Sequence, residues 1–198
     1  MKRFCLLCVL LAVSLVACQP IQPGGALTQG VTHHPVESDR MVGAMSAAPA
    51  AVANDATILD SSSPEGGDII VLRQGTNGWT CFPDGLSTPG NDPVCYDATW
   101  AAWNDAFAKG EEPNVAAPGV AYMWQGGSDP SHSDPMASQP APGEDWVNSP
   151  PHIMILAPGG FDAADFATEA KEDEPWIMWE GTPYEHLMVP VTPIAQDA

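Results

Sequence analysis

Two short segments in the C-terminal part of the chain carry histidine and methionine at the same spacing. They are His152-Ile153-Met154 and His186-Leu187-Met188, and each lies within an apolar run that predicts a strand. Residues two apart in a strand project from one face, so each histidine should lie beside its methionine. Imidazole together with thioether sulfur suits Cu(I). Two neighbouring strands would therefore form a soft-metal site, to which Met123 and Met178 could contribute.

The same residues also fit a methionine-rich core in which both histidines are simply hydrogen bonded, and residue types alone favour that interpretation. The His-x-Met spacing resembles part of the motif of periplasmic copper chaperones, although the rest of that motif has no counterpart here. The resemblance implies copper as the cofactor. The metal site and the ordinary core both remain open at this point.

A polar loop over residues 126–151 contains another group of ligand types. Ser128-Asp129-Pro130 and Ser133-Asp134-Pro135 repeat within it, and Glu144 and Asp145 follow. Hard oxygen ligands in an acidic chain fit calcium, although less well than copper fits the histidines and methionines. The spacing matches no EF-hand, and Asp-Pro pairs commonly begin turns, so a plain turn-rich loop is the competing interpretation.

Signatures of the familiar enzyme classes are absent from the sequence, including Gly-x-Ser-x-Gly, His-Glu-x-x-His and the Walker loop. A hydrolase would have to use His152 or His186 with a carboxylate such as Glu180 or Glu185 to activate water. We therefore expect a binding or structural module of unknown ligand rather than an enzyme.

Residues 1–17 have the layout of an export signal. A basic start, Met1-Lys2-Arg3, precedes an apolar run that is too short to span a bilayer of ~30 Å. Its end, Leu15-Val16-Ala17-Cys18, resembles the lipobox of bacterial lipoproteins. The resemblance implies an exported protein that begins at Cys18 and is anchored to the membrane of the cell envelope by fatty acids such as palmitate. A cleaved signal with an incidental cysteine is the alternative.

Gln19 rather than aspartate follows the cysteine. The resemblance to Gram-negative lipoproteins then implies attachment to the outer membrane, if the host is Gram-negative. The chain of 198 residues has 6 Lys and Arg against 25 Asp and Glu, a formal charge of -19. This charge would repel a polyphosphate, so nucleic acid is not an expected partner.

Residues 18–66 are rich in Pro, Gly, Ala, Ser and Thr without an aromatic residue, and they predict a flexible lipidated linker.

Cys81 and Cys95 are the cysteines left after Cys5 and Cys8 depart with the signal and Cys18 takes lipid. Outside the cytoplasm we expect them to form a disulfide, with two buried free thiols as the alternative.

Every tryptophan falls between Trp79 and Trp179, so the folded domain is predicted over 67–190, with a tail at 191–198. We expect an α+β domain with a mostly antiparallel sheet and two short helices, preceded by a disordered tether. The helices are predicted at 97–109 and 162–171, and the strands at 68–74, 79–82, 120–125, 152–156, 176–179 and 184–189. Asn77-Gly78 predicts a hairpin between the first two strands.

Two longer runs support a recurring domain. Gly75-Thr76-Asn77-Gly78-Trp79-Thr80-Cys81 and Met178-Trp179-Glu180-Gly181-Thr182-Pro183-Tyr184 resemble those of an uncharacterised group of exported bacterial proteins. The resemblance covers most of 67–190 and implies no particular chemistry.

Overall fold

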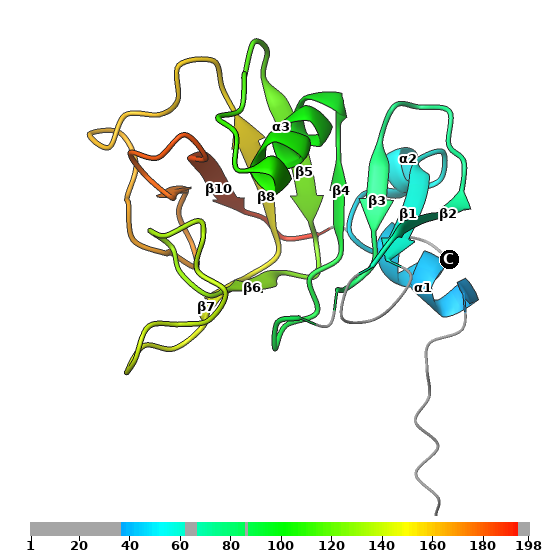
Figure 1. Cartoon of the computed structure of the whole chain (residues 1–198), viewed down its shortest axis with the longest axis horizontal. Coiled ribbons are helices and arrows are strands. Elements are labelled where there is room, and N and C mark those ends of the chain that lie inside the picture. The colour runs from blue at the N-terminus through cyan, green and yellow to red at the C-terminus, as the bar shows by residue number, and fades with distance from the viewer. Residues whose placement is uncertain (1–36, 62–66, 86, 194–198) are drawn as a thin grey trace, which may run out of the picture. The chain divides into compact units, whose positions relative to one another are not determined.

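The computed structural model describes residues 37–61, 67–85 and 87–193, all within the unit Pro35–Ala198. Its centre is an eight-stranded, mostly antiparallel sheet with the order β2-β1-β3-β4-β5-β8-β10-β9 (Figure 1). The strands of this sheet are β1 (Thr57–Ser61), β2 (Ile69–Arg73), β3 (Thr80–Phe82), β4 (Val94–Tyr96), β5 (Gly119–Met123), β8 (His152–Leu156), β9 (Trp176–Met178) and β10 (His186–Pro190). A separate ribbon pairs β6 (Gly127–Asp129) with β7 (Val147–Ser149). The predicted α+β fold is confirmed.

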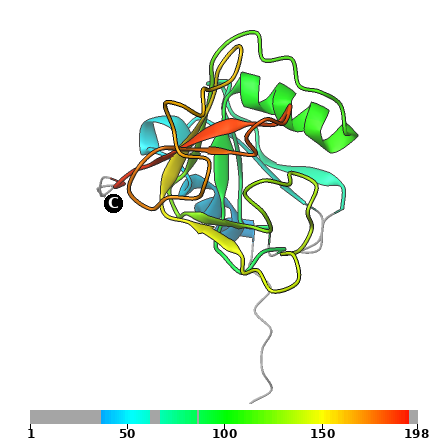
Figure 2. The ribbon, with the colours of Figure 1, turned by 90° about the vertical axis from the view of Figure 1, so that its left-hand side faces the viewer.

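Helices cover both faces of the sheet. α1 (Glu37–Met45) contacts β1, β3 and β4 and is followed by the short α2 (Ala50–Ala53). α3 (Ala98–Lys109) contacts β4 and β5, and Figure 2 shows it lying across one side of the sheet. Alternation along β4 separates the two faces. Cys95 packs in a cluster that includes Ala44 of α1, while its neighbours Val94 and Tyr96 pack with the tryptophans of α3.

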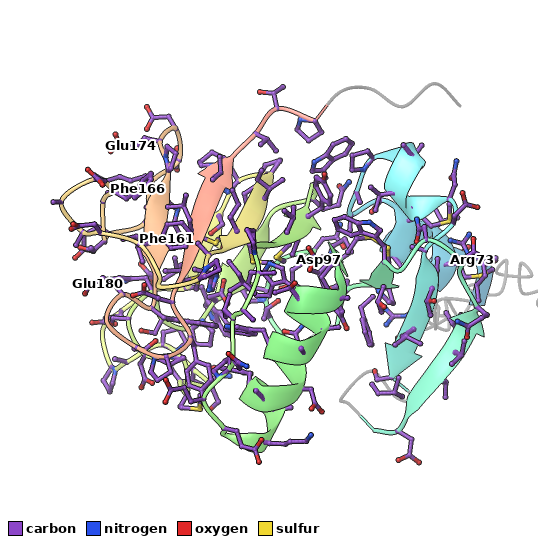
Figure 3. All side chains as sticks on the ribbon, turned by 90° about the horizontal axis from the view of Figure 1, so that it is seen from above. Arg73, Asp97, Phe161, Phe166, Glu174 and Glu180 are labelled. Atoms are coloured by element: carbon purple, nitrogen blue, oxygen red, sulfur yellow. A yellow bond between two sulfur atoms is a disulfide. The ribbon has the colours of Figure 1, made fainter. Side chains whose placement is uncertain are left out.

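α3 is the helix predicted from the residues around Asp97. The Asp97 carboxylate accepts a hydrogen bond from the Trp100 amide (3.0 Å), and Gly110 ends the helix in the left-handed conformation (φ 68°). Figure 3 places Asp97 at the start of this helix. The caps fix where α3 begins and ends, and the buried Trp100 and Trp103 show which of its faces turns toward the sheet.

The prediction of a flexible linker from 18 to 66 is wrong for residues 37–61. These residues form α1, α2 and β1, and a guanidinium-carboxylate pair between Arg40 and Asp60 (2.5 Å) joins α1 to β1. The core that they share is made mostly of small side chains: Ala44, Ala47, Ala48, Ala53, Ala56, Ile58, Cys81 and Cys95. Alanine lets a helix approach the sheet closely and leaves no aromatic signal in the sequence. Residues 1–36, and with them the predicted signal and Cys18, lie outside the described residues.

The predicted hairpin between 68–74 and 79–82 is also wrong. β1 lies between these two strands, antiparallel to β2 and parallel to β3. Asn77 does not close a two-residue hairpin, because β2 and β3 both pair with β1 and not with each other. Its side-chain amide donates instead to the carbonyl of Val52 (2.7 Å). The segment 74–79 therefore connects two strands that flank a third.

The predicted helix at 162–171 is replaced by turns. The Asp165 amide donates to the Asp162 carbonyl (2.9 Å), and the carbonyl of Ala167 accepts a hydrogen bond from Ile177 (2.7 Å). This isolated bridge holds the segment against β9 instead of allowing a helix. Phe161 and Phe166, both labelled in Figure 3, pack edge to face (6.0 Å). Among the described residues, α1 and α3 are thus the two helices that are longer than the four-residue α2.

The predicted disulfide is confirmed. Cys81 and Cys95 are direct partners in the β3–β4 pair and are joined across a sequence separation of 14. The closing hairpin of β9 and β10 is confirmed as well. In the predicted tail, the Val191 amide donates to the Pro151 carbonyl (2.8 Å), and residues 194–198 lie outside the described part. Within the described ranges, every helix is too short or too polar to cross a membrane.

A truncation series tests whether the domain begins before residue 67. A chain starting at Pro35 should unfold cooperatively, whereas a chain starting at Gly67 lacks β1 and leaves β2 and β3 without their shared neighbour. Thermal unfolding followed by circular dichroism should show no cooperative transition for the shorter chain. Equal melting temperatures for the two chains would show that residues 37–61 are not part of the fold.

Candidate functional site

A cavity of about 280 Å³ lies between α3 and the face of the sheet that α3 covers, which we call the inner face. Its sheet side is made by alternate residues of four neighbouring strands: Ala121, Met123, His152, Met154, Met178, His186 and Met188. Its helix side is made by Trp100, Trp103 and Phe107, which recur at helical spacing on α3. The aromatic face of α3 therefore packs on β4 and β5 in part, through the core cluster that Trp100 and Trp103 share with Ala121, and also lines the cavity.

The strand register brings the four predicted His and Met ligands to this one cavity. β8 and β10 are antiparallel neighbours in which Met154 lies directly opposite Met188. Direct cross-strand neighbours have Cβ atoms about 5 Å apart, so the two thioethers lie side by side on the sheet. On the outer strands, Met123 lies opposite His152 and Met178 lies opposite His186. Each imidazole therefore has a methionine on the neighbouring strand as well as one on its own strand.

His152 has the hydrogen bonding that a metal-ligating histidine needs. It is 2% exposed, and its Nδ1 donates to the Pro150 carbonyl (2.7 Å), which leaves the lone pair on Nε2. Nε2 is buried without a hydrogen-bond partner in the described structure. Burial lowers the pKa of His152 to about 4, so the ring is neutral across the range in which most proteins work.

His186 repeats this arrangement. It is 1% exposed, and its Nδ1 donates to the Tyr184 carbonyl (3.1 Å). Burial lowers the pKa of His186 to about 4, and the nearby His152 adds to the effect. The edges and faces of Trp100 and Trp179 surround the ring at centroid distances of 5.2 and 5.1 Å. Neither imidazole therefore carries a charge that would oppose a bound cation.

Aromatic rings exclude water from this end of the cavity. Trp103, Phe107 and Trp179 are nearly parallel, with centroids 5.2 Å apart in the first pair and 5.7 Å apart in the second. Trp179 has a left-handed backbone (φ 56°), which is unusual for a bulky residue. Its amide and indole N–H hold it there by donating to the carbonyls of His132 (2.8 Å) and Ser131 (2.9 Å). The loop 131–132 thus fixes one wall of the cavity.

Carboxyl groups occupy another part of the wall. Burial and the charge of Asp92 raise the pKa of Asp129 to about 7. Burial and a hydrogen bond with Asp84 raise the pKa of Asp92 to about 6, while the Thr88 hydroxyl donates to it. The sequence gives no signal for Asp92, because an aspartate between Asn91 and Pro93 is typical of an ordinary turn. A cation in the cavity would favour the ionised form of both groups.

The residues of the calcium hypothesis do not gather at one point. Asp129 lines the cavity, whereas Asp134 is exposed and accepts a hydrogen bond from the Met136 amide (2.9 Å). Glu144 and Asp145 are exposed. Over 37–61, 67–85 and 87–193, no three or more His, Cys, Asp and Glu side chains form a group that could hold a metal. A metal site in this part of the chain would therefore depend on methionine.

The carboxylates of the hydrolase hypothesis lie elsewhere. Glu185 accepts hydrogen bonds from the amides of Phe161 (3.0 Å) and Gly181 (3.1 Å), which ties two loops together. Glu180 is exposed, and Figure 3 places it at the periphery of the molecule. The Nδ1 atoms of His152 and His186 bond to backbone carbonyls, so neither ring is oriented by a carboxylate through that atom.

Neither the models of known protein families, nor the curated proteins, nor the solved structures compared with this chain match it. The function is therefore argued from the cavity itself.

Asp129→Asn tests the burial of the acidic wall. Because its folded pKa of about 7 is above the ordinary value of 3.8, Asp129 contributes stability at pH 4 that is lost as the pH rises through 7. Asparagine has no such titration. Relative to wild type, the variant should be more stable at pH 8 than at pH 5 by roughly 1–3 kcal/mol, measured by urea unfolding. An equal difference at the two pH values would mean that the carboxyl is solvated.

Proposed function

We propose that this domain binds a soft monovalent cation, Cu(I), in the cavity between the sheet and α3. The single observation that carries the proposal is the buried Nε2 of His152, which has no hydrogen-bond partner in the described structure and shares its cavity with the thioethers of Met154 and Met188. A lone pair buried in this way costs about 1–3 kcal/mol unless something binds to it. Imidazole and thioether sulfur together are the ligand set that Cu(I) prefers.

The ionisation of the ligands supports the same ion. Thioethers do not protonate, and the pKa of each imidazole is about 4, so protons do not compete for the ligands until the medium is strongly acidic. The aromatic wall disfavours ions that keep bound water, such as Mg²⁺ and Ca²⁺. The formal charge of -19 and the carboxyl groups of Asp92 and Asp129 attract cations toward the cavity.

We further propose that the chain is held at the cell envelope by lipid on Cys18. The support is the run Leu15-Val16-Ala17-Cys18 behind a basic start and an apolar segment. One fatty acid gives only marginal membrane binding, and two or three give stable attachment. A tethered module of this kind would bind copper outside the cytoplasm, where the disulfide also persists.

Replacing methionine sulfur by carbon tests the metal proposal. Met154→Leu with Met188→Leu keeps the side-chain volume and removes two ligands, so it should leave the fold nearly unchanged. Loss of an outer-shell partner already weakens metal binding about 10- to 100-fold, and loss of two direct ligands should cost at least as much. The affinity is measured anaerobically by competition with a chromophoric Cu(I) chelator.

A matched control comes from the same chain. Met136→Leu changes an exposed methionine (55%) outside the cavity and should leave the affinity unchanged. His152→Gln should weaken binding. Wild-type affinity in the double methionine variant would exclude the cavity as the copper site.

Labelling with a palmitate analogue tests the anchor. Cells producing the chain should incorporate the label, and Cys18→Ala should abolish the incorporation and release the protein from the membrane fraction. Cys81→Ser, which removes a cysteine of the disulfide, is the matched control and should still be labelled. An unlabelled wild-type chain would contradict the anchor and leave the copper proposal standing.

A further inference from the structure

The ligands on the four central strands are arranged with an approximate twofold symmetry. β8 and β10 are antiparallel and meet at Met154 opposite Met188, so a local axis between these two residues exchanges the strands. The operation places His152, two residues before Met154, on His186, two residues before Met188. The spacing noticed in the sequence is therefore a symmetry of the sheet.

The outer strands obey the same symmetry. β5 pairs with β8 so that Met123 faces His152, and β9 pairs with β10 so that Met178 faces His186. The equivalence is not an internal repeat of the chain. A long excursion through β6 and β7 joins β5 to β8, whereas a short turn joins β9 to β10.

The hydrogen bonds that orient the imidazoles are equivalent too. Each ring donates from Nδ1 to the carbonyl two residues earlier in the chain, Pro150 for His152 and Tyr184 for His186. Both rings therefore carry the Nε2 lone pair, and both line the cavity.

The register separates the two imidazoles along the strands. His152 lies opposite Pro190, and His186 is four residues away from Pro190 on β10. Four residues correspond to about 13 Å of strand, whereas a histidine and the methionine two residues on are about 7 Å apart. A single ion can therefore reach one histidine and its neighbouring methionines more easily than it can reach both imidazoles.

We propose that the cavity holds two soft-cation sites, one formed by His152, Met123 and Met154 and the other by His186, Met178 and Met188. This inference rests on the proposed function and adds its stoichiometry and its ligand assignment. The two sites differ in their surroundings. The wall with Asp92 adjoins Met123, since both lie against Gly127, while aromatic rings enclose His186. The ions should therefore bind with different affinities.

Counting bound Cu(I) on the full-length chain in detergent tests the inference. The wild type should bind two equivalents in competition with the chelator. Met123→Leu with Met154→Leu, and separately Met178→Leu with Met188→Leu, should each bind one, because the two ligand sets share no residue. The variant with all four substitutions should bind none above background, and its background also reports any metal held by unlipidated cysteines. Met136→Leu, outside the cavity, should bind two.

The outcomes separate the inference from the proposed function. A wild-type chain that binds no Cu(I) above the four-substitution background contradicts both. One equivalent in the wild type supports copper binding and overturns the two sites. A pair variant that loses both ions, or that loses neither, also overturns the two sites. If a variant fails to fold, native mass spectrometry of the wild type with Cu(I) decides: two bound ions support the inference, and a single bound ion overturns it.

Discussion

The register of β8 against β10 is the constraint on which the cavity depends. Side chains alternate between the faces of a strand, so a slip of one residue would send His186 and Met188 to the opposite face. Ile155 and Leu187 pair on that opposite face, and burying Leu187 and Ile177 there opposes such a slip. The apolar outer face thus holds the imidazole and thioether side chains of the inner face in place.

Burial of the imidazoles costs the fold free energy. Two neutral rings with pKa values of about 4 must remain unprotonated, and the Nε2 atom of His152 lacks a partner in the described structure. Trp179 adds a backbone conformation that a bulky residue rarely adopts. Such costs gathered at one cavity are typical of a functional site. A bound cation would recover part of them, so copper should stabilise the folded chain.

The sequence predicts this fold best where apolar runs and caps are strong. β8 occupies the predicted residues 152–156, and α3 begins and ends at the caps Asp97 and Gly110. Prediction from the sequence fails where the core is built from alanine, as between α1 and β1. Ala44 and Ala56 carry no signal that distinguishes them from the residues of a linker. Prediction also fails for long-range order, since nothing local places β1 between β2 and β3.

The sequence also predicts the candidate site only in part. The His-x-Met spacing identifies which residues share a face, but only the pairing of strands separated by β9 and its turns shows that Met154 meets Met188. Asp129 stood out in the sequence only as part of a Ser-Asp-Pro repeat, and Asp92 had no signal, because its raised pKa comes from burial and from Asp84 across a turn. Turn residues become site residues only through the fold.

Copper binding in the cavity is tested most directly by observing the methionine thioethers themselves. Methionine labelled with ¹³C at the ε-methyl group allows each thioether to be followed by NMR while diamagnetic Cu(I) is added. We predict that the methyl signals of Met154 and Met188, with those of Met123 and Met178, move to new positions, while the signal of exposed Met136 stays in place. Cavity methyl signals that remain unchanged at saturating Cu(I) would contradict copper binding in the cavity.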